Sequence, residues 1–189
     1  MSPAELEELT KQIRPMPRAK HEVDCFLTYI ETELGIYEQE YGLELVPDFQ
    51  RGHKWTQEQQ EHFVESVIRG AITTAGLLIQ FNCPSLEQST KVGDLPRTMQ
   101  CVDGLQRLTA LRRYVAGEIK AFGRYAAELE KTPFDARRYN IRIAMHSFQT
   151  RVELLQYYLD LNAGGTPHAP EELDRVRALL AEELAKQNA

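Results

Sequence analysis

Residues 99–111 constrain the fold of this chain more than any other stretch. They begin as a short apolar run, after which Asp103 and Gly104 form a typical turn signal. Beyond the turn, apolar residues recur at the spacing of a helix face: Leu105, Leu108, Leu111 and Val115. The pattern therefore predicts a strand, a tight turn and the first turn of a helix.

A helix that starts at this turn offers a place for an anion. The first amides of a helix have no partner within it and carry partial positive charge. Arg107 lies in this first turn, where a cation is unfavourable for the helix dipole unless an anion joins it. Two interpretations stay open. Arg107 faces a bound phosphate or carboxylate, or it is solvated or paired with a nearby carboxylate.

Length, charge and cysteine content narrow the class of protein. The chain has 189 residues, 42% of them hydrophobic, which is enough for one domain with a substantial core. Its net charge of −6 argues against broad, non-specific binding to a DNA backbone, which needs a basic face. Cys25, Cys83 and Cys101 form no C-x-x-C pair, so neither a disulfide framework nor a zinc site is predicted. Without a signal peptide or an apolar run of membrane length, a cytoplasmic protein with no membrane contact is expected.

Hydrophobic spacing and helix caps divide the rest of the chain into helices and short strands. Helices are predicted over residues 2–13, about 20–35, 56–70, 104–117, 125–131, 150–161 and 170–184. Strands are predicted over residues 43–46, 76–81, 99–102, 119–122 and 139–145. The first two helices, within residues 1–42, are expected to form an N-terminal helical segment packed on the core. Residues 43–189 are expected to complete one compact domain.

Two loops carry residues that suit a ligand. Residues 47–55 hold Arg51 beside a glycine, where a guanidinium can grip a phosphate with two hydrogen bonds; a salt bridge to Asp48 is the alternative. Trp55, just before a predicted helix cap, is expected to act as a hydrophobic staple. Residues 162–168 are rich in glycine. They either close over a ligand or end one helix and start the next.

Four segments together resemble one family: residues 47–55, 65–70, 103–109 and 161–167. In order and spacing they resemble the DGQQR-motif domain of GmrSD-type restriction systems, a branch of the ParB/sulfiredoxin-like superfamily. Residues 104–110 also fit the G-x-x-R-x-x-A pattern of ParB proteins. The resemblance covers about residues 43–180. It implies a compact α+β fold with a ParB/sulfiredoxin-like core, a small mixed sheet packed by helices. It also implies binding and hydrolysis of a nucleoside triphosphate, with Mg²⁺ as a candidate companion.

The resemblance assigns roles to particular residues. The expected nucleotide-binding residues are Gln50, Arg51, Gly104, Leu105, Arg107, Asn162, Gly164, Gly165 and Thr166. The expected catalytic residues are Asp103, Gln106 and Arg107. Asp103 either holds Mg²⁺, usually through water, or caps the helix, and we expect the cap. Gln106 either orients an attacking water or packs against or hydrogen-bonds to the loop.

Two departures from the family pattern bear on function. Leu105 stands where the family has the first glutamine of DGQQR, so any hydrolysis is expected to be slow. The sequence also ends where larger relatives continue into an HNH-type nuclease domain, so a protein partner in a nucleic-acid-processing system is expected; a homo-oligomer is left open. One alternative is a catalytically inert interaction or regulatory protein, for example phage-encoded. Another is a ParB-like DNA nuclease, which needs clustered carboxylates such as Asp48, Asp94 and Asp103.

Overall fold

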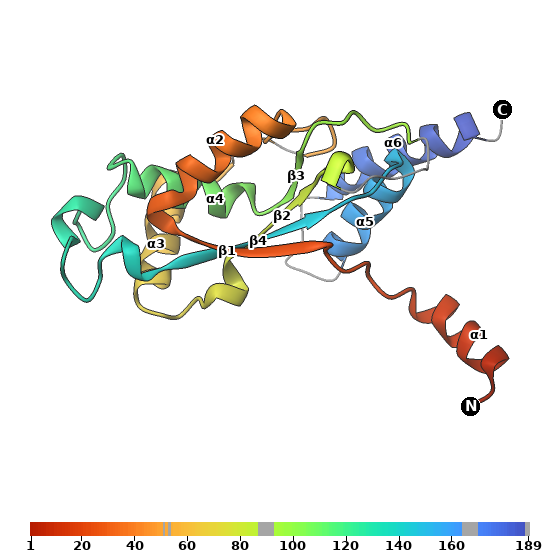
Figure 1. The fold of residues 1–189 in the computed structure, drawn as a ribbon, viewed down its shortest axis with the longest axis horizontal. Helices are drawn as coiled ribbons and strands as arrows, with labels where there is room; N and C mark the ends of the chain where they lie inside the picture. The colour runs from red at the N-terminus through yellow and green to blue at the C-terminus, as the bar shows by residue number, and fades with distance from the viewer. Residues whose placement is uncertain (51, 53, 87–92, 164–169, 188–189) are drawn as a thin grey trace.

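The computed structural model describes residues 1–50, 52, 54–86, 93–163 and 170–187, and within them the fold is mixed α+β, as predicted. The helices are α1 (Pro3–Ile13), α2 (Ile30–Tyr41), α3 (Gln57–Ile68), α4 (Leu105–Val115), α5 (Arg151–Ala163) and α6 (Pro170–Gln187). The strands are β1 (His21–Phe26), β2 (Leu78–Asn82), β3 (Gln100–Asp103) and β4 (Asn140–His146). Figure 1 shows the helices arranged around a central twisted sheet.

The sheet has the order β1-β4-β2-β3 and mixes both directions. β1 runs antiparallel to β4, β4 runs parallel to β2, and β2 runs antiparallel to β3. The strand predicted over residues 43–46 is reduced to a single bridge, between Glu44 and Gln100 at the β3 edge. The strand predicted over residues 119–122 likewise shrinks to one bridge, between Ala121 and Arg124.

Helices cover both faces of this sheet. Cys101 and Val102 are neighbours in β3, and successive side chains of a strand point to opposite faces. Cys101 belongs to the apolar cluster formed with α2, α3 and α4, whereas Val102 belongs to the cluster formed with Phe49, α5 and α6. The turn that follows β3 therefore lies where the two layers of helices meet.

The helix predicted from about residue 20 is wrong, because residues 21–26 form the edge strand β1. Val23, Cys25 and Leu27 alternate along the chain and pack in the core, which is the period of a strand. Ile30 and Leu34 share a helical spacing with them but belong to α2, which starts only at Ile30. Residues 1–42 therefore contribute a strand and a helix to the same sheet and core as the rest of the chain.

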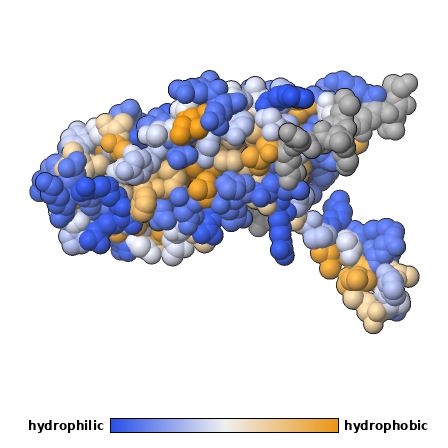
Figure 2. Space-filling view, in the orientation of Figure 1, coloured by the Kyte–Doolittle hydropathy of each residue, from blue (hydrophilic) through white to orange (hydrophobic). Residues whose placement is uncertain are grey.

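The first helix, α1, starts where the sequence predicts, but it does not pack on the core as expected. Ser2 and Glu5 form a capping box at its N-terminus, which accounts for this start. However, none of its residues is buried, and it stands away from the body in Figures 1 and 2. Leu6, Leu9 and Ile13 are 51%, 38% and 63% exposed, so the expected cover of the core by this helix is absent.

The later helices agree with their predicted starts. Thr56 with Gln59 forms a capping box at α3, and Thr150 with Glu153 exchanges the same pair of hydrogen bonds at α5. Val176 of α6 is fully buried, so this helix packs against the core. Residues 125–131 form a short 3₁₀ helix, Ala126–Leu129, rather than an α-helix. None of the described helices combines the length and apolar character that crossing a membrane requires.

Candidate functional site

The turn between β3 and α4 depends on Gly104. Its φ is +94°, in the left-handed region that favours glycine. A Cβ placed on it would lie 2.7 Å from Ile79 Cδ1, 3.2 Å from Ile79 Cα and 3.2 Å from Leu78 O. Gly104 therefore allows the left-handed backbone conformation of the turn, and its lack of a side chain lets the turn lie directly against β2.

The first turn of α4 begins without a side-chain cap. Gly104 is the N-cap residue, and no described side chain accepts a hydrogen bond from the amides of this turn. The first hydrogen bond within the helix is donated by Leu108 N to Gly104 O, at 2.8 Å. The expectation that Asp103 caps the helix is therefore wrong. Its carboxylate instead accepts a hydrogen bond from Arg107, one helical turn onward.

A pocket of about 540 Å³ opens at this turn. Of the predicted site residues, the structure brings together Gln50, Asp103, Gly104, Leu105, Gln106, Arg107 and Asn162 on its wall. They come from the loop before α3, the β3–α4 turn and the end of α5. Arg51, Gly164, Gly165 and Thr166 lie outside the described residues. The described part of the predicted site thus converges on one cavity although its segments are far apart in sequence.

Arg107 and Asp103 are the charged residues among the described lining of this pocket. Their side chains are 28% and 32% exposed, so the ion pair is half-buried. The Nε of Arg107 is buried and has no hydrogen-bond partner among the described residues. A buried N–H without a partner is costly. Arg107 is therefore paired with a nearby carboxylate, as one of the two interpretations expects, and it keeps one buried donor without a partner among the described residues.

Gln106 joins α4 to the loop before α3. Its Oε1 accepts hydrogen bonds from Lys54 N at 2.8 Å and Trp55 N at 3.1 Å. Its Nε2 donates to Gly52 O at 3.3 Å. Both ends of the amide are therefore engaged by the loop backbone, which agrees with the predicted hydrogen bond to the loop.

Gln50 ties the same loop to β3. With its amide nitrogen turned toward the sheet, it donates to Cys101 O at 2.7 Å and to Leu45 O at 3.3 Å. Cys101 itself is fully buried, and burial raises the pKa of its thiol to about 12. A buried thiol with a raised pKa is a poor nucleophile, so Cys101 serves packing here.

The outer side of this loop is held by α5 and α6. Arg151 Nη2 lies 2.5 Å from the carboxylate of Asp48, and Arg175 donates to the backbone oxygen of Asp48. Arg175 Nη2 also lies 3.5 Å from Gln50 O. The loop that forms one wall of the pocket is therefore anchored by α4, α5 and α6.

Some lining residues have no predicted role in binding. The sequence assigns no ligand contact to Trp55, Phe63, Ile72 or Tyr158, yet all four line the pocket. The ring of Trp55 packs on Phe63, with centroids 5.2 Å apart. Gln60 donates through Nε2 to Trp55 O at 3.1 Å, which places it beside Trp55. In the sequence, a binding role for Trp55 is indicated only by its place in residues 47–55, the segment that also contains the predicted site residue Gln50.

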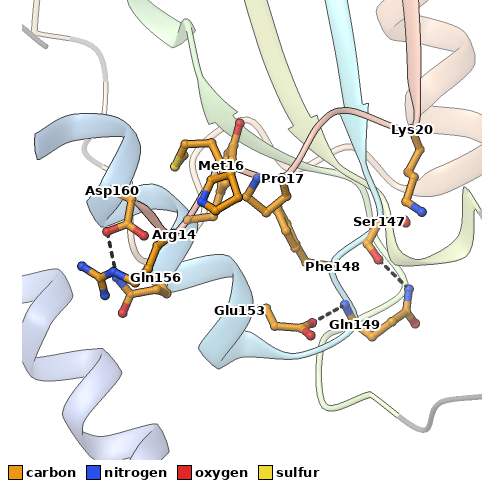
Figure 3. A pocket seen from close by; sticks show the side chains of 12 residues that line it. Arg14, Met16, Pro17, Lys20, Ser147, Phe148, Gln149, Glu153, Gln156 and Asp160 are labelled. Atoms are coloured by element: carbon orange, nitrogen blue, oxygen red, sulfur yellow. Dashed lines mark hydrogen bonds between the residues drawn. The ribbon is translucent and has the colours of Figure 1, made fainter. Parts of the chain in front are cut away.

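A second pocket, of about 570 Å³, lies on another side of α5 and contains none of the predicted site residues. Figure 3 shows side chains of the linker after α1, among them Met16 and Pro17, together with Phe148 and residues of α5. Tyr157 of α5 lines this second pocket, whereas Tyr158 lines the first. The helix α5 therefore contributes to the walls of both cavities.

Two of the three aspartates considered for a nuclease contact the same arginine in the described structure, and the third pairs with a different one. Asp48 pairs with the guanidinium of Arg151, and Asp94 Oδ1 accepts from Arg151 N at 2.6 Å. Asp103 pairs with Arg107. Within the described ranges, no three His, Cys, Asp or Glu side chains form a group that could hold a metal ion.

Comparison with models of known protein families identifies the family of this chain. The family model described as "GmrSD restriction endonuclease, N-terminal domain" matches residues 33–185. Neither the curated proteins nor the solved structures provide a match. The matched region contains every described residue that lines the pocket at the β3–α4 turn. The chain therefore belongs to the family of GmrSD restriction endonuclease N-terminal domains.

Proposed function

We propose that the pocket at the β3–α4 turn binds a nucleoside triphosphate, so that the chain is the nucleotide-responsive part of a DNA restriction or defence system. The observation that carries the proposal is the convergence of Gln50, residues 103–107 and Asn162 on one cavity. Its volume of about 540 Å³ falls within the range of ordinary small-molecule sites.

The phosphates would bind at the first turn of α4. This turn has no side-chain cap, so its amides and the helix dipole favour an anion. Gly104 allows a ligand to approach the backbone closely, because it has no side chain. The buried Nε of Arg107 would gain a partner in a phosphate oxygen.

The ion pair of Asp103 and Arg107 would respond to the ligand. A phosphate competes with Asp103 for the guanidinium, because both are anions that its N–H groups can bind. Mg²⁺ is commonly held by one or two carboxylates together with substrate phosphates. Asp103, released from Arg107, would supply such a carboxylate beside the phosphates.

Rapid hydrolysis is not part of the proposal. Gln106 is already engaged by three backbone groups of the loop and is therefore poorly placed to orient an attacking water. Leu105 is 5% exposed and packs in the core, at the position where the family has a glutamine. These two observations favour a site that binds and responds over one that turns over quickly.

The test is a calorimetric and thermal-shift titration with ATP, GTP, CTP and UTP, with and without Mg²⁺. Saturable binding to at least one is expected, and Arg107→Ala should weaken it by more than tenfold while the variant still unfolds cooperatively. The matched control is Arg112→Ala on the same helix, whose side chain pairs with Glu31 rather than lining the pocket. Equal affinity in the wild type and Arg107→Ala would contradict the proposal.

One observation favours the interaction protein as a second candidate. The face of α1 formed by Leu6, Leu9 and Ile13 is exposed and touches no core cluster among the described residues. Apolar residues at this spacing are typical of a helix that packs against another surface. If none of the four nucleotides binds, this reading takes precedence, and the pocket would be a structural remnant of the family fold.

A further inference from the structure

The lining of the pocket at the β3–α4 turn combines charged and apolar groups. Asp103, Arg107 and the uncapped amides of α4 form a charged end. The same lining also includes apolar and aromatic side chains: Trp55, Phe63, Ile72, Val102, Leu105 and Tyr158. A phosphate chain alone would leave these apolar side chains without a ligand partner, whereas a ligand with a flat, apolar-faced ring would contact both kinds of group.

Trp55 is held in place by the same helix turn that carries the charged end. Its backbone N–H donates to Gln106 Oε1 at 3.1 Å, and Gln106 is the neighbour of Arg107 in the first turn of α4. Its ring packs on the buried Phe63 with an interplanar angle of 57°. The side chain is only partly buried, so some of its surface remains open to a ligand. The backbone of Trp55 is therefore tied to the helix turn that carries the charged end, and its ring is packed against Phe63.

We propose that Trp55 stacks on the base of the bound nucleotide and that this contact, rather than the phosphates, decides that the ligand is a nucleotide. The inference rests on the proposed function of the same pocket. An aromatic side chain stacks on any base, because every base presents a π-face. The expected ligands are therefore nucleoside triphosphates with only modest differences among the four bases. Inorganic tripolyphosphate should bind more weakly.

The first test needs no variant, because Trp55 is the single tryptophan of the chain. A base stacked on an indole changes its fluorescence, so saturating nucleotide should quench or shift the emission of the wild-type protein. Tripolyphosphate, which has no ring, should leave the emission nearly unchanged while binding at the same turn. Calorimetry on the same samples gives the saturation point. Unchanged emission at saturation with nucleotide would overturn the assignment of Trp55.

The second test compares two substitutions of the same residue. Trp55→Phe keeps an aromatic face, and Trp55→Leu keeps only apolar volume. We expect the wild type and Trp55→Phe to bind nucleotide at least tenfold more tightly than tripolyphosphate. In Trp55→Leu this ratio should fall to about twofold, since stacking is lost while the charged end remains. Phe134→Leu is the control, because Phe134 is exposed and does not line the pocket.

The ratio of the nucleotide and tripolyphosphate affinities can still be interpreted if Trp55→Leu is less stable, because partial unfolding lowers both affinities by the same factor. A ratio that stays at the wild-type value in Trp55→Leu overturns the inference and leaves the proposed function standing. If the wild-type protein binds tripolyphosphate as tightly as nucleotide, that result also overturns the inference and leaves the proposed function standing. A wild-type protein that binds neither ligand contradicts the proposed function itself.

Discussion

Gly104 is the residue on which the geometry of the pocket depends most directly. Two independent constraints apply to Gly104: its φ is positive, and the turn approaches Ile79 of β2 closely. Only glycine meets both, because any other residue carries a Cβ. The same residue starts α4, so its conformation sets the direction in which the first amides of that helix face.

Replacing Gly104 by alanine should destabilise the protein by about 3 kcal/mol. The left-handed conformation accounts for roughly 1–2 kcal/mol of this, and the overlap with Ile79 for the remainder. Gly117 provides the control, since its φ is +74° but a Cβ there would meet nothing within 4 Å. Gly117→Ala should therefore cost only about 1 kcal/mol. Urea unfolding of both variants measures the difference, and equal losses would show that the approach to Ile79 is unimportant.

At the scale of elements, the pocket is the meeting point of α4 with the loop before α3. Gln106 supplies three hydrogen bonds across this junction, while Arg151 and Arg175 hold the opposite side of the loop. The contacts of Gln106 join parts of the chain about fifty residues apart, and those of Arg151 and Arg175 join parts more than one hundred residues apart. The wall of the pocket is thus built from long-range contacts, and its shape depends on them.

Gln106→Ala should lower nucleotide affinity and stability together. Loss of its hydrogen bonds leaves loop amides without a partner, at a cost of about 1–2 kcal/mol, and frees Trp55 from its position. Gln57→Ala is the matched control, because Gln57 is exposed and bonds only to Glu61 among the described residues. Titration and urea unfolding are the measurements. Unchanged affinity with a slower hydrolysis rate would instead indicate that Gln106 positions a water.

The two N-terminal elements should differ sharply in their effect on stability. Deleting residues 1–13 removes α1, which buries no side chain, so the free energy of unfolding should change by less than about 0.5 kcal/mol. Deleting residues 1–26 also removes β1, which pairs with β4 along its full length and places Cys25 in the core. That variant should fail to fold cooperatively. Circular dichroism during thermal unfolding distinguishes the two, and a large loss from the shorter deletion would mean that α1 packs on the body.

At the scale of the whole molecule, the sheet is covered on both faces and retains a polar cluster between the sheet and α5. Gln80, His146 and Tyr157 lie within hydrogen-bond distance of one another, with Tyr157 OH 2.6 Å from Gln80 Oε1. The imidazole of His146 also stacks on Phe148, with centroids 5.3 Å apart. Burial lowers the pKa of His146 below its usual value, and the charge of Glu22 opposes this shift only in part.

This cluster predicts a loss of stability in mild acid. The unfolded chain protonates His146 near pH 6.5, whereas the folded chain resists protonation until lower pH. The contribution of His146 is therefore complete above about pH 6.5 and declines below it. Between pH 7 and pH 5, His146→Gln should lose less stability than the wild type, because glutamine does not titrate in this range. His62→Gln, on the exposed side of α3, is the control; the same pH profile in all three proteins would contradict the prediction.

Several features of this protein follow from the sequence alone, because they depend on neighbours along the chain. The capping boxes at Ser2, Thr56 and Thr150 each join residues three positions apart. The turn at Gly104 and the helix after it depend on local backbone preference and on apolar spacing. The family resemblance rests on the same kind of information, since motifs are read in order.

Other features were decided only by tertiary structure. Whether residues 21–26 form a helix or a strand depends on pairing with β4, more than a hundred residues away, where Asp24 also meets Arg142 at 2.8 Å. The engagement of Gln106 by the loop, the pairing of Asp103 with Arg107 and the place of Trp55 in the pocket are likewise contacts in space. The sequence determined which local segments form and which residues belong to the family motif. The contact partners of these segments are determined by the tertiary structure. Alternative long-range contacts compete, and only packing of the whole chain selects among them.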